Sequence, residues 1–166
     1  MTQQTLVPVR AQQVPVRWTP VPQTSARGGA GAPLSSEVLR LLARADGELV
    51  AAAMSGPPWE RYLHAHLAAL RAAAAVLAVR GTPRGRGAPR DVWGLAERVA
   101  PELAGWWSYF ASGARLRLAI EAGRTDRVGA QRADEAVGCA ERAVEAVRVA
   151  LGLADDPAGA LAPAAS

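Results

Sequence analysis

Apolar residues that recur with the period of an α-helix constrain this chain more than any other feature of its sequence. The clearest example is the segment 58–80. At about 100° per residue, one helical face there gathers six residues within about 80°: Trp59, Leu63, His66, Leu70, Ala74 and Leu77. This face predicts a helix that packs into a core, with His66 at the centre of the stripe. Because no stretch alternates apolar and polar residues as a strand does, we expect an all-α protein.

Helix caps and breakers divide the rest of the chain into further helices. Ser35 or Ser36 serves as an N-cap, and Gly56–Pro58 separates the first helix from the second. Pro101 either kinks a third helix or starts a fourth, because proline lacks the amide donor that a helix interior needs. The expected helices span about residues 35–54, 58–80, 90–120 in one or two pieces, and 129–151. We therefore expect an up-and-down bundle of about four to five helices over residues 34–153.

Two segments outside this bundle are expected to be disordered tails. Residues 1–33 are rich in Pro, Arg and Gly and repeat Val-Pro-Val-Arg at 7–10 and 14–17, whereas residues 154–166 are rich in Ala, Pro and Gly. Alternating proline favours extended geometry, so we interpret the first tail as a spacer. The alternative is a short linear motif that binds a partner groove. Trp18 has no core to join and is a candidate anchor for such a partner.

The single cysteine and the two histidines narrow the chemistry of this chain. Because Cys139 is the single cysteine, the chain can form neither an internal disulfide nor a zinc site built on paired cysteines, so we expect no metal and no cofactor.

The longest apolar run, Ala72–Val79, is far shorter than the ~20 residues of a membrane-spanning helix. Residues 1–10 lack the cationic and apolar regions of a signal peptide. We expect a cytoplasmic protein with a reduced thiol and no membrane partner.

The positive charge is unevenly distributed along the chain. The net charge is +4, and residues 1–33 contain three arginines and no acidic residue. Four further arginines surround one expected loop: Arg80, Arg84, Arg86 and Arg90. Together with Trp18, these four are candidate binding residues for an anionic partner such as RNA or a nucleotide, held by salt-dependent attraction. The alternative is that these arginines are ordinary solubilising residues. All 19 Lys+Arg residues are Arg, which is typical of a GC-rich genome.

Two long segments resemble a known protein family. They read RYLHAHLAALR at residues 61–71 and VAPELAGW at residues 99–106, and Ala-Asp-Glu follows at residues 133–135. In this order they resemble the small actinobacterial HEPN-domain proteins, a branch of the higher-eukaryote-and-prokaryote nucleotide-binding superfamily. The resemblance covers about residues 35–153 and leaves both tails outside it.

The resemblance implies a short helical bundle, of a kind that is often dimeric in this superfamily. Many members are metal-independent ribonucleases that use an Arg-x(4–6)-His motif at a dimer cleft. Others are non-catalytic partners of nucleotidyltransferases, or modules that bind RNA or nucleotides. This chain contains Arg61-x4-His66. In such a pair the histidine acts as general acid or base on a ribose 2′-hydroxyl, and the arginine stabilises the phosphoryl charge.

Helical geometry argues against that pairing. Five residues rotate about 140° around a helix, which places Arg61 nearly opposite the apolar face that holds His66. We interpret His66 as a packed core histidine with one hydrogen-bonded nitrogen. We expect Arg61 and His64 on an exposed face, with His64 paired to Glu60 one helical turn away.

Tryptophan supplies most of the large aromatic side chains, with five residues in the chain. We expect Trp93, Trp106 and Trp107 to fill the core or a dimer interface, because aromatic residues dominate both. The adjacent residues Trp106 and Trp107 cannot point the same way, so we expect one of them to stay partly exposed.

Three functions follow from these observations. The favoured one is a non-catalytic HEPN-like module, expected as a homodimer, that binds a nucleotide, RNA or a partner protein. The second is a metal-independent ribonuclease that uses Arg61 and His66. The third is a structural bundle that recruits partners through its basic, Pro-rich tail.

Overall fold

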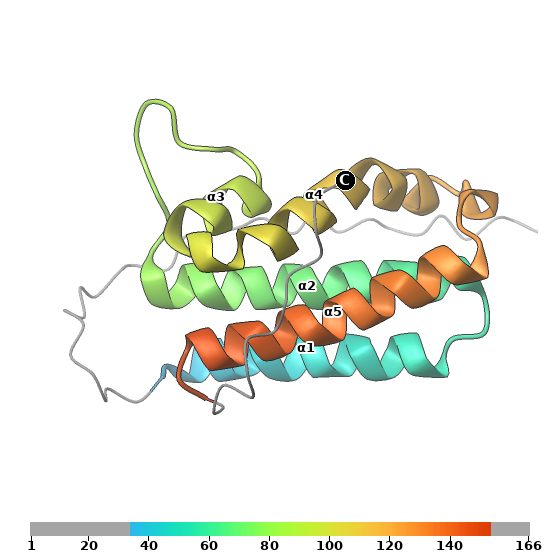
Figure 1. Ribbon diagram of the computed structural model, residues 1–166, viewed down its shortest axis with the longest axis horizontal. Helices are drawn as coiled ribbons and strands as arrows, with labels where there is room; N and C mark the ends of the chain where they lie inside the picture. Colours follow the sequence, from blue (N-terminus) through green and yellow to red (C-terminus); the bar gives the residue numbers. More distant parts are fainter. Residues whose placement is uncertain (1–33, 154–166) are drawn as a thin grey trace, which may run out of the picture. The chain divides into compact units, whose positions relative to one another are not determined.

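Five α-helices make up the part of the chain that the computed structural model describes, residues 34–153 (Figure 1). They are α1 (Ser36–Met54), α2 (Pro58–Arg80), α3 (Val92–Val99), α4 (Ala104–Glu121) and α5 (Ala130–Ala150). The 3-10 turns Pro101–Leu103 and Thr125–Arg127 precede α4 and α5. No strand occurs between residues 34 and 153, so the predicted all-α fold is confirmed. The predicted tails, with their repeat and Trp18, lie outside the described residues.

Local chemistry explains where the helices begin and end. The Ser35 hydroxyl accepts a hydrogen bond from the Val38 amide at 3.4 Å and caps α1. Gly81 ends α2 with a φ of 86°, a conformation that glycine adopts without a steric cost. Ala100 has φ −140° and ψ 66°, which breaks the helix after α3. Pro101 then opens the 3-10 turn that leads into α4, so it starts a separate helix and does not kink one.

The central helix of the bundle is α2. It packs along α1 and α5, and it also contacts α3 and α4 (Figure 1). The buried side chains of α1, α2 and α5 are mostly alanines, which allow close approach of the helices: Ala45, Ala52, Ala65, Ala68, Ala69, Ala72, Ala73, Ala75, Ala133, Ala136, Ala140, Ala143 and Ala146. By contrast, α3 and α4 contribute large aromatic side chains to the core: Trp93, Trp106, Trp107 and Phe110.

The core face predicted for α2 is too narrow. His66 and Leu77 are buried, but the other members of the predicted face are only half-buried: Trp59, Leu63, Leu70 and Ala74. Buried residues instead occur around most of the helix, because four other helices surround it. A single apolar stripe is the pattern of a surface helix, and α2 is a core helix.

By length and composition alone, α2 could also cross a membrane. In the structure, 56% of its most apolar window is buried, and the core helix of a soluble bundle meets the same criterion. One such helix is therefore a weak indication, and the expected absence of a membrane partner stays a prediction.

Candidate functional site

His66, the candidate acid–base residue, lies in the core between α2, α3 and α4. Its side chain is 2% exposed. Two aromatic rings lie nearly perpendicular to the imidazole, with centroid distances of 5.3 Å to Trp93 and 5.5 Å to Phe110. The Tyr62 ring lies 6.1 Å away on the same helix. We refer to these four residues as the His66 cluster; its burial agrees with the interpretation of His66 as a core histidine.

Helix α4 packs closely against the His66 cluster and excludes solvent from it. The Tyr62 hydroxyl donates a hydrogen bond to the Gly113 carbonyl at 3.3 Å. A Cβ atom at Gly113 would collide with that hydroxyl and lie 3.6 Å from the His66 ring, so only glycine fits here without a shift. The backbone of α4 therefore takes the place that solvent or a substrate would need to reach the imidazole.

The protonation state of His66 follows from this burial. Burial lowers the pKa of His66 to about 4, and the positive charge of Arg117 also lowers it. The imidazole is therefore neutral near pH 7. The predicted hydrogen bond is not seen at Nε2, which is buried without a partner among the described residues.

Arg61 faces a different side of the bundle. Its Nη2 atom pairs with the Asp134 carboxylate at 2.9 Å, and its Nη1 atom donates a hydrogen bond to the Gly56 carbonyl at 3.3 Å. It borders a shallow depression of about 360 Å³ between α1, α2 and α5, whose lining is Ala52, Ala53, Arg61, Asp134, Val137, Gly138 and Glu141. The structure therefore does not bring Arg61 and His66 together.

The prediction that Arg61 and His64 lie on an exposed face of α2 is wrong. His64 pairs with Glu48 of α1, with 2.8 Å between Nδ1 and Oε2, and not with Glu60. The side chains of Arg61 and His64 are only 23% and 30% exposed. The reason is again that α1 and α5 cover α2, so polar side chains on those sides find partners on the neighbouring helices.

Arg80 differs from the other three arginines of the predicted basic loop. Its guanidinium pairs with Glu102 and donates hydrogen bonds to the Val99 carbonyl at 3.0 Å and the Ala150 carbonyl at 3.3 Å. These contacts tie the C-terminal end of α2 to α3 and α5. Arg80 therefore contributes to the fold, and its charge is largely neutralised.

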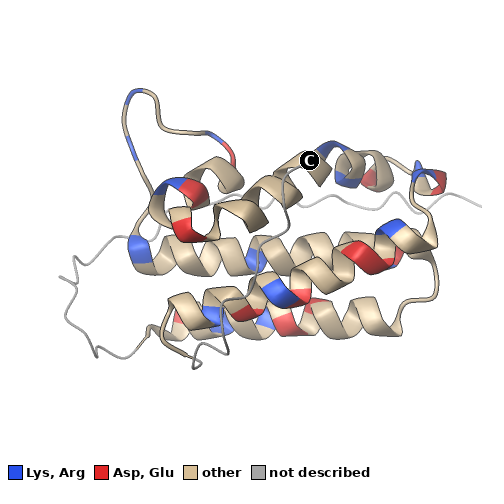
Figure 2. Ribbon diagram, viewed as in Figure 1, with Lys and Arg blue, Asp and Glu red and all other residues tan. Residues whose placement is uncertain are grey.

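The remaining three arginines lie on an exposed loop between α2 and α3, residues 81–91, which we call the arginine loop (Figure 2). Arg84, Arg86 and Arg90 are all exposed. Within residues 34–153, none of the three forms an ion pair with a carboxylate. The structure thus brings three unneutralised cations to one loop.

The arginine loop is fixed to α3 on its C-terminal side. Arg98 donates a hydrogen bond to the Gly87 carbonyl at 3.0 Å. The Pro89 ring packs so closely on Gly94 that a Cβ atom there would lie 2.8 Å from it. Asp91 accepts a hydrogen bond from the Gly94 amide at 3.0 Å and caps α3. These contacts hold the base of the loop, while Arg84 and Arg86 extend beyond it.

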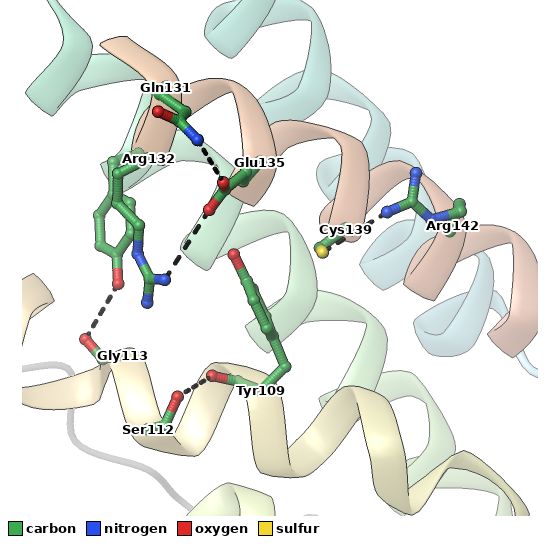
Figure 3. Close-up of polar contacts among 9 residues, drawn as sticks. Tyr109, Ser112, Gly113, Gln131, Arg132, Glu135, Cys139 and Arg142 are labelled. Carbon is green, nitrogen blue, oxygen red and sulfur yellow. Dashed lines mark hydrogen bonds and ion pairs between the residues drawn. The ribbon is translucent and has the colours of Figure 1, made fainter. Parts of the chain in front are cut away.

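A second cluster, which sequence reasoning missed, joins α4 and α5 (Figure 3). The Arg132 guanidinium lies over the Tyr109 ring at 5.6 Å, and Arg142 lies over the Trp106 ring at 5.8 Å. Arg142 also contacts the buried Cys139 sulfur at 3.6 Å. The spacing of seven and three residues between these members of α5 places them on one helical face, a signal that the sequence did carry.

This cluster corrects the expectation for the two adjacent tryptophans. Trp106 and Trp107 are each 1% exposed, so neither stays partly exposed. Trp106 is covered by Arg142 of α5, whereas Trp107 stacks on Trp93 of α3 at 6.4 Å. They point in different directions, as predicted, but each direction leads into a different packed interface.

Within the described residues, no group of three or more His, Cys, Asp or Glu side chains could hold a metal ion.

Among known proteins, the sequence model of the SAV_6107-like HEPN family matches residues 51–148, which is more than half of the chain. No curated protein and no solved structure matches it.

Proposed function

Since the chain belongs to the SAV_6107-like HEPN family, we propose that it is a non-catalytic HEPN module that binds RNA through its arginine loop. The observation that carries this proposal is the 2% exposure of His66, the histidine on which the ribonuclease alternative depends. A general base must lie within hydrogen-bond reach of the proton it removes, and α4 seals His66 from any ribose hydroxyl.

The other members of the ribonuclease alternative are also engaged elsewhere. Arg61 is paired with Asp134 on another side of α2, so it cannot stabilise charge beside His66. His64 is bound to Glu48 through Nδ1. Arg61 and His66 therefore cannot act as a pair, and the positive charge of Arg117 near His66 only lowers the pKa of that histidine, which supports a binding role over catalysis.

The arginine loop supports RNA as the ligand. Three exposed guanidinium groups without carboxylate partners attract a phosphate backbone, and their contacts release condensed counterions. Each phosphate contact on a single strand contributes about 0.7 to the slope of log affinity against log salt concentration. Three contacts therefore contribute about 2 to that slope.

The test measures binding and cleavage of a labelled single-stranded RNA pool in the presence of a chelator. The loop variant Arg84→Ala/Arg86→Ala/Arg90→Ala should bind more weakly and lose about 2 from the salt slope. The matched control removes three exposed arginines elsewhere on the described surface: Arg115→Ala/Arg124→Ala/Arg127→Ala. It should bind as the wild type does.

The same assay decides between binding and catalysis. The RNA should remain intact with the wild-type protein. A His66→Phe variant keeps an aromatic ring in the cluster and removes the titratable group. RNA cleavage that survives the chelator, and that this folded variant abolishes, would overturn the non-catalytic proposal in favour of the ribonuclease.

We also propose that the module is a homodimer through α1. Its outer face carries Leu39, Val50 and Met54, which are 49%, 63% and 83% exposed. Asp46 lies between them on this face and is paired with Arg148 of α5. Leu39 and Met54 lie equally far from the midpoint between residues 46 and 47, and so do Ala43 and Val50. An antiparallel pair of α1 helices about a two-fold axis would therefore place Leu39 on the partner's Met54.

A further inference from the structure

We infer that the arginine loop binds the phosphate chain of its ligand without reading bases, so that inorganic polyphosphate is a ligand of the same site. This inference rests on the proposed binding function and goes further, because it names the chemical group that is recognised. Three observations carry it: the aromatic residues, the side chains of the loop, and the local charge.

The arginine loop has no aromatic side chain on which a base could stack. Single-stranded nucleic acids are read largely by stacking of their bases on exposed rings. Among the described residues, five of the aromatic side chains are buried: Tyr62, Trp93, Trp106, Trp107 and Phe110. The half-buried Trp59 lies at the opposite end of α2, roughly 30 Å from Arg80 along the helix. Arg132 covers the ring of Tyr109, which is also half-buried.

The side chains of the loop also lack the acceptors that base readout needs. Residues 81–90 are Gly, Thr, Pro, Arg, Gly, Arg, Gly, Ala, Pro and Arg. Apart from guanidinium groups, they offer only the hydroxyl of the half-buried Thr82. Oδ1 of the Asp91 carboxylate, which follows these residues, accepts the hydrogen bond of the Gly94 amide. Amino groups of adenine, cytosine and guanine therefore meet no carboxylate or amide oxygen from residues 81–90, and the guanine acceptors O6 and N7 are the one base feature that the guanidinium groups can contact.

The net charge of the loop is positive, because it has three exposed arginines and one acidic residue, Asp91, at its end beside α3. Glu102 neutralises Arg80, and this leaves Arg84, Arg86 and Arg90. Gly85 and Gly87 have φ values of 105° and 82°, so the backbone on both sides of Arg86 adopts a conformation that side chains rarely permit. A guanidinium between two glycines meets little steric hindrance from its neighbours, which suits it to a continuous chain of phosphates more than to one shaped nucleotide.

The experiment uses the full chain and a fluorescently labelled single-stranded RNA, displaced by unlabelled competitors at equal charge concentration. The competitors are the same RNA, single-stranded DNA of the same sequence, two homopolymer RNAs, inorganic polyphosphate, and polyglutamate as a carboxylate control. All phosphate chains should displace the label within about threefold of one another, and polyglutamate should be much weaker. Direct binding of labelled polyphosphate should fall at least tenfold in Arg84→Ala/Arg86→Ala/Arg90→Ala.

Each contrary result has its own meaning. If RNA binds but polyphosphate does not displace it, or if homopolymers differ more than tenfold, this inference is wrong while the proposed function stands. If no RNA binds, the proposed function itself is wrong. Binding of polyphosphate that persists in the loop variant, but is lost in Arg10→Ala/Arg17→Ala/Arg27→Ala, would overturn the assignment to the loop.

Discussion

Lowering the pH from 7 to 5 should destabilise this protein by about 2 kcal/mol through His66 alone. Burial lowers the pKa of His66 to about 4, against about 6.5 in the unfolded chain. Between these values, the unfolded state binds a proton at His66 that the folded state does not. The stability is therefore fully present above pH 6.5 and is lost as the pH falls toward 4. By pH 4 the loss reaches about 3 kcal/mol.

Urea unfolding followed by tryptophan fluorescence measures this loss, because Trp93 and Trp107 lie in the core. The free energy of unfolding of the wild type should fall by about 2 kcal/mol more than that of His66→Phe between pH 7 and pH 5. An equal loss in the wild type and in His66→Phe would refute the claim that His66 is buried and neutral.

Three further predictions concern packing, assembly and the tail. Gly113→Ala should cost about 2 kcal/mol of stability, because its Cβ would collide with the Tyr62 hydroxyl; the control Gly47→Ala, with nothing within 4 Å, should gain about 0.5–1 kcal/mol in the same thermal unfolding assay. Met54→Glu should reduce the mass measured by light scattering from dimer to monomer, whereas Leu118→Glu on α4 should not; a dimer in both would remove α1 from the interface. Deletion of residues 1–33 should leave RNA binding by the loop measurable in an anisotropy titration, and its complete loss would favour recruitment by the tail.

The sequence was sufficient to predict the helices, because their boundaries depend on local chemistry. Ser35, Gly81 and Pro101 mark ends or starts through hydrogen bonding and backbone conformation that a few neighbouring residues determine. It was not sufficient to show that α2 is surrounded. The apolar stripe around His66 has the width of a surface helix, and the alanines on the other sides of α2 are too common in any helix to indicate burial.

The same limit applies to the predicted site residues. Relations set by the geometry of one helix could be predicted, and contacts between helices could not. The rotation between Arg61 and His66 follows from helical geometry, and the structure places them on different sides of α2. The partners of Arg61 and His64 come from α5 and α1 respectively, and long-range pairing cannot be read from local spacing. Arg80 looks identical to Arg84 in the sequence, yet Glu102 pairs with it from beyond α3. Only tertiary structure separates the structural arginine from the exposed ones.

The most direct test of the central claim is the NMR spectrum of the histidine side chains during an RNA titration at pH 6.5. A His64→Gln variant assigns the two imidazoles. The account predicts that the His66 signals are those of a neutral ring and do not shift when RNA binds, while the side-chain signals of Arg84 and Arg86 do. Signals of His66 that shift on addition of RNA would contradict it, because they would place the ligand beside a residue that α4 is inferred to seal.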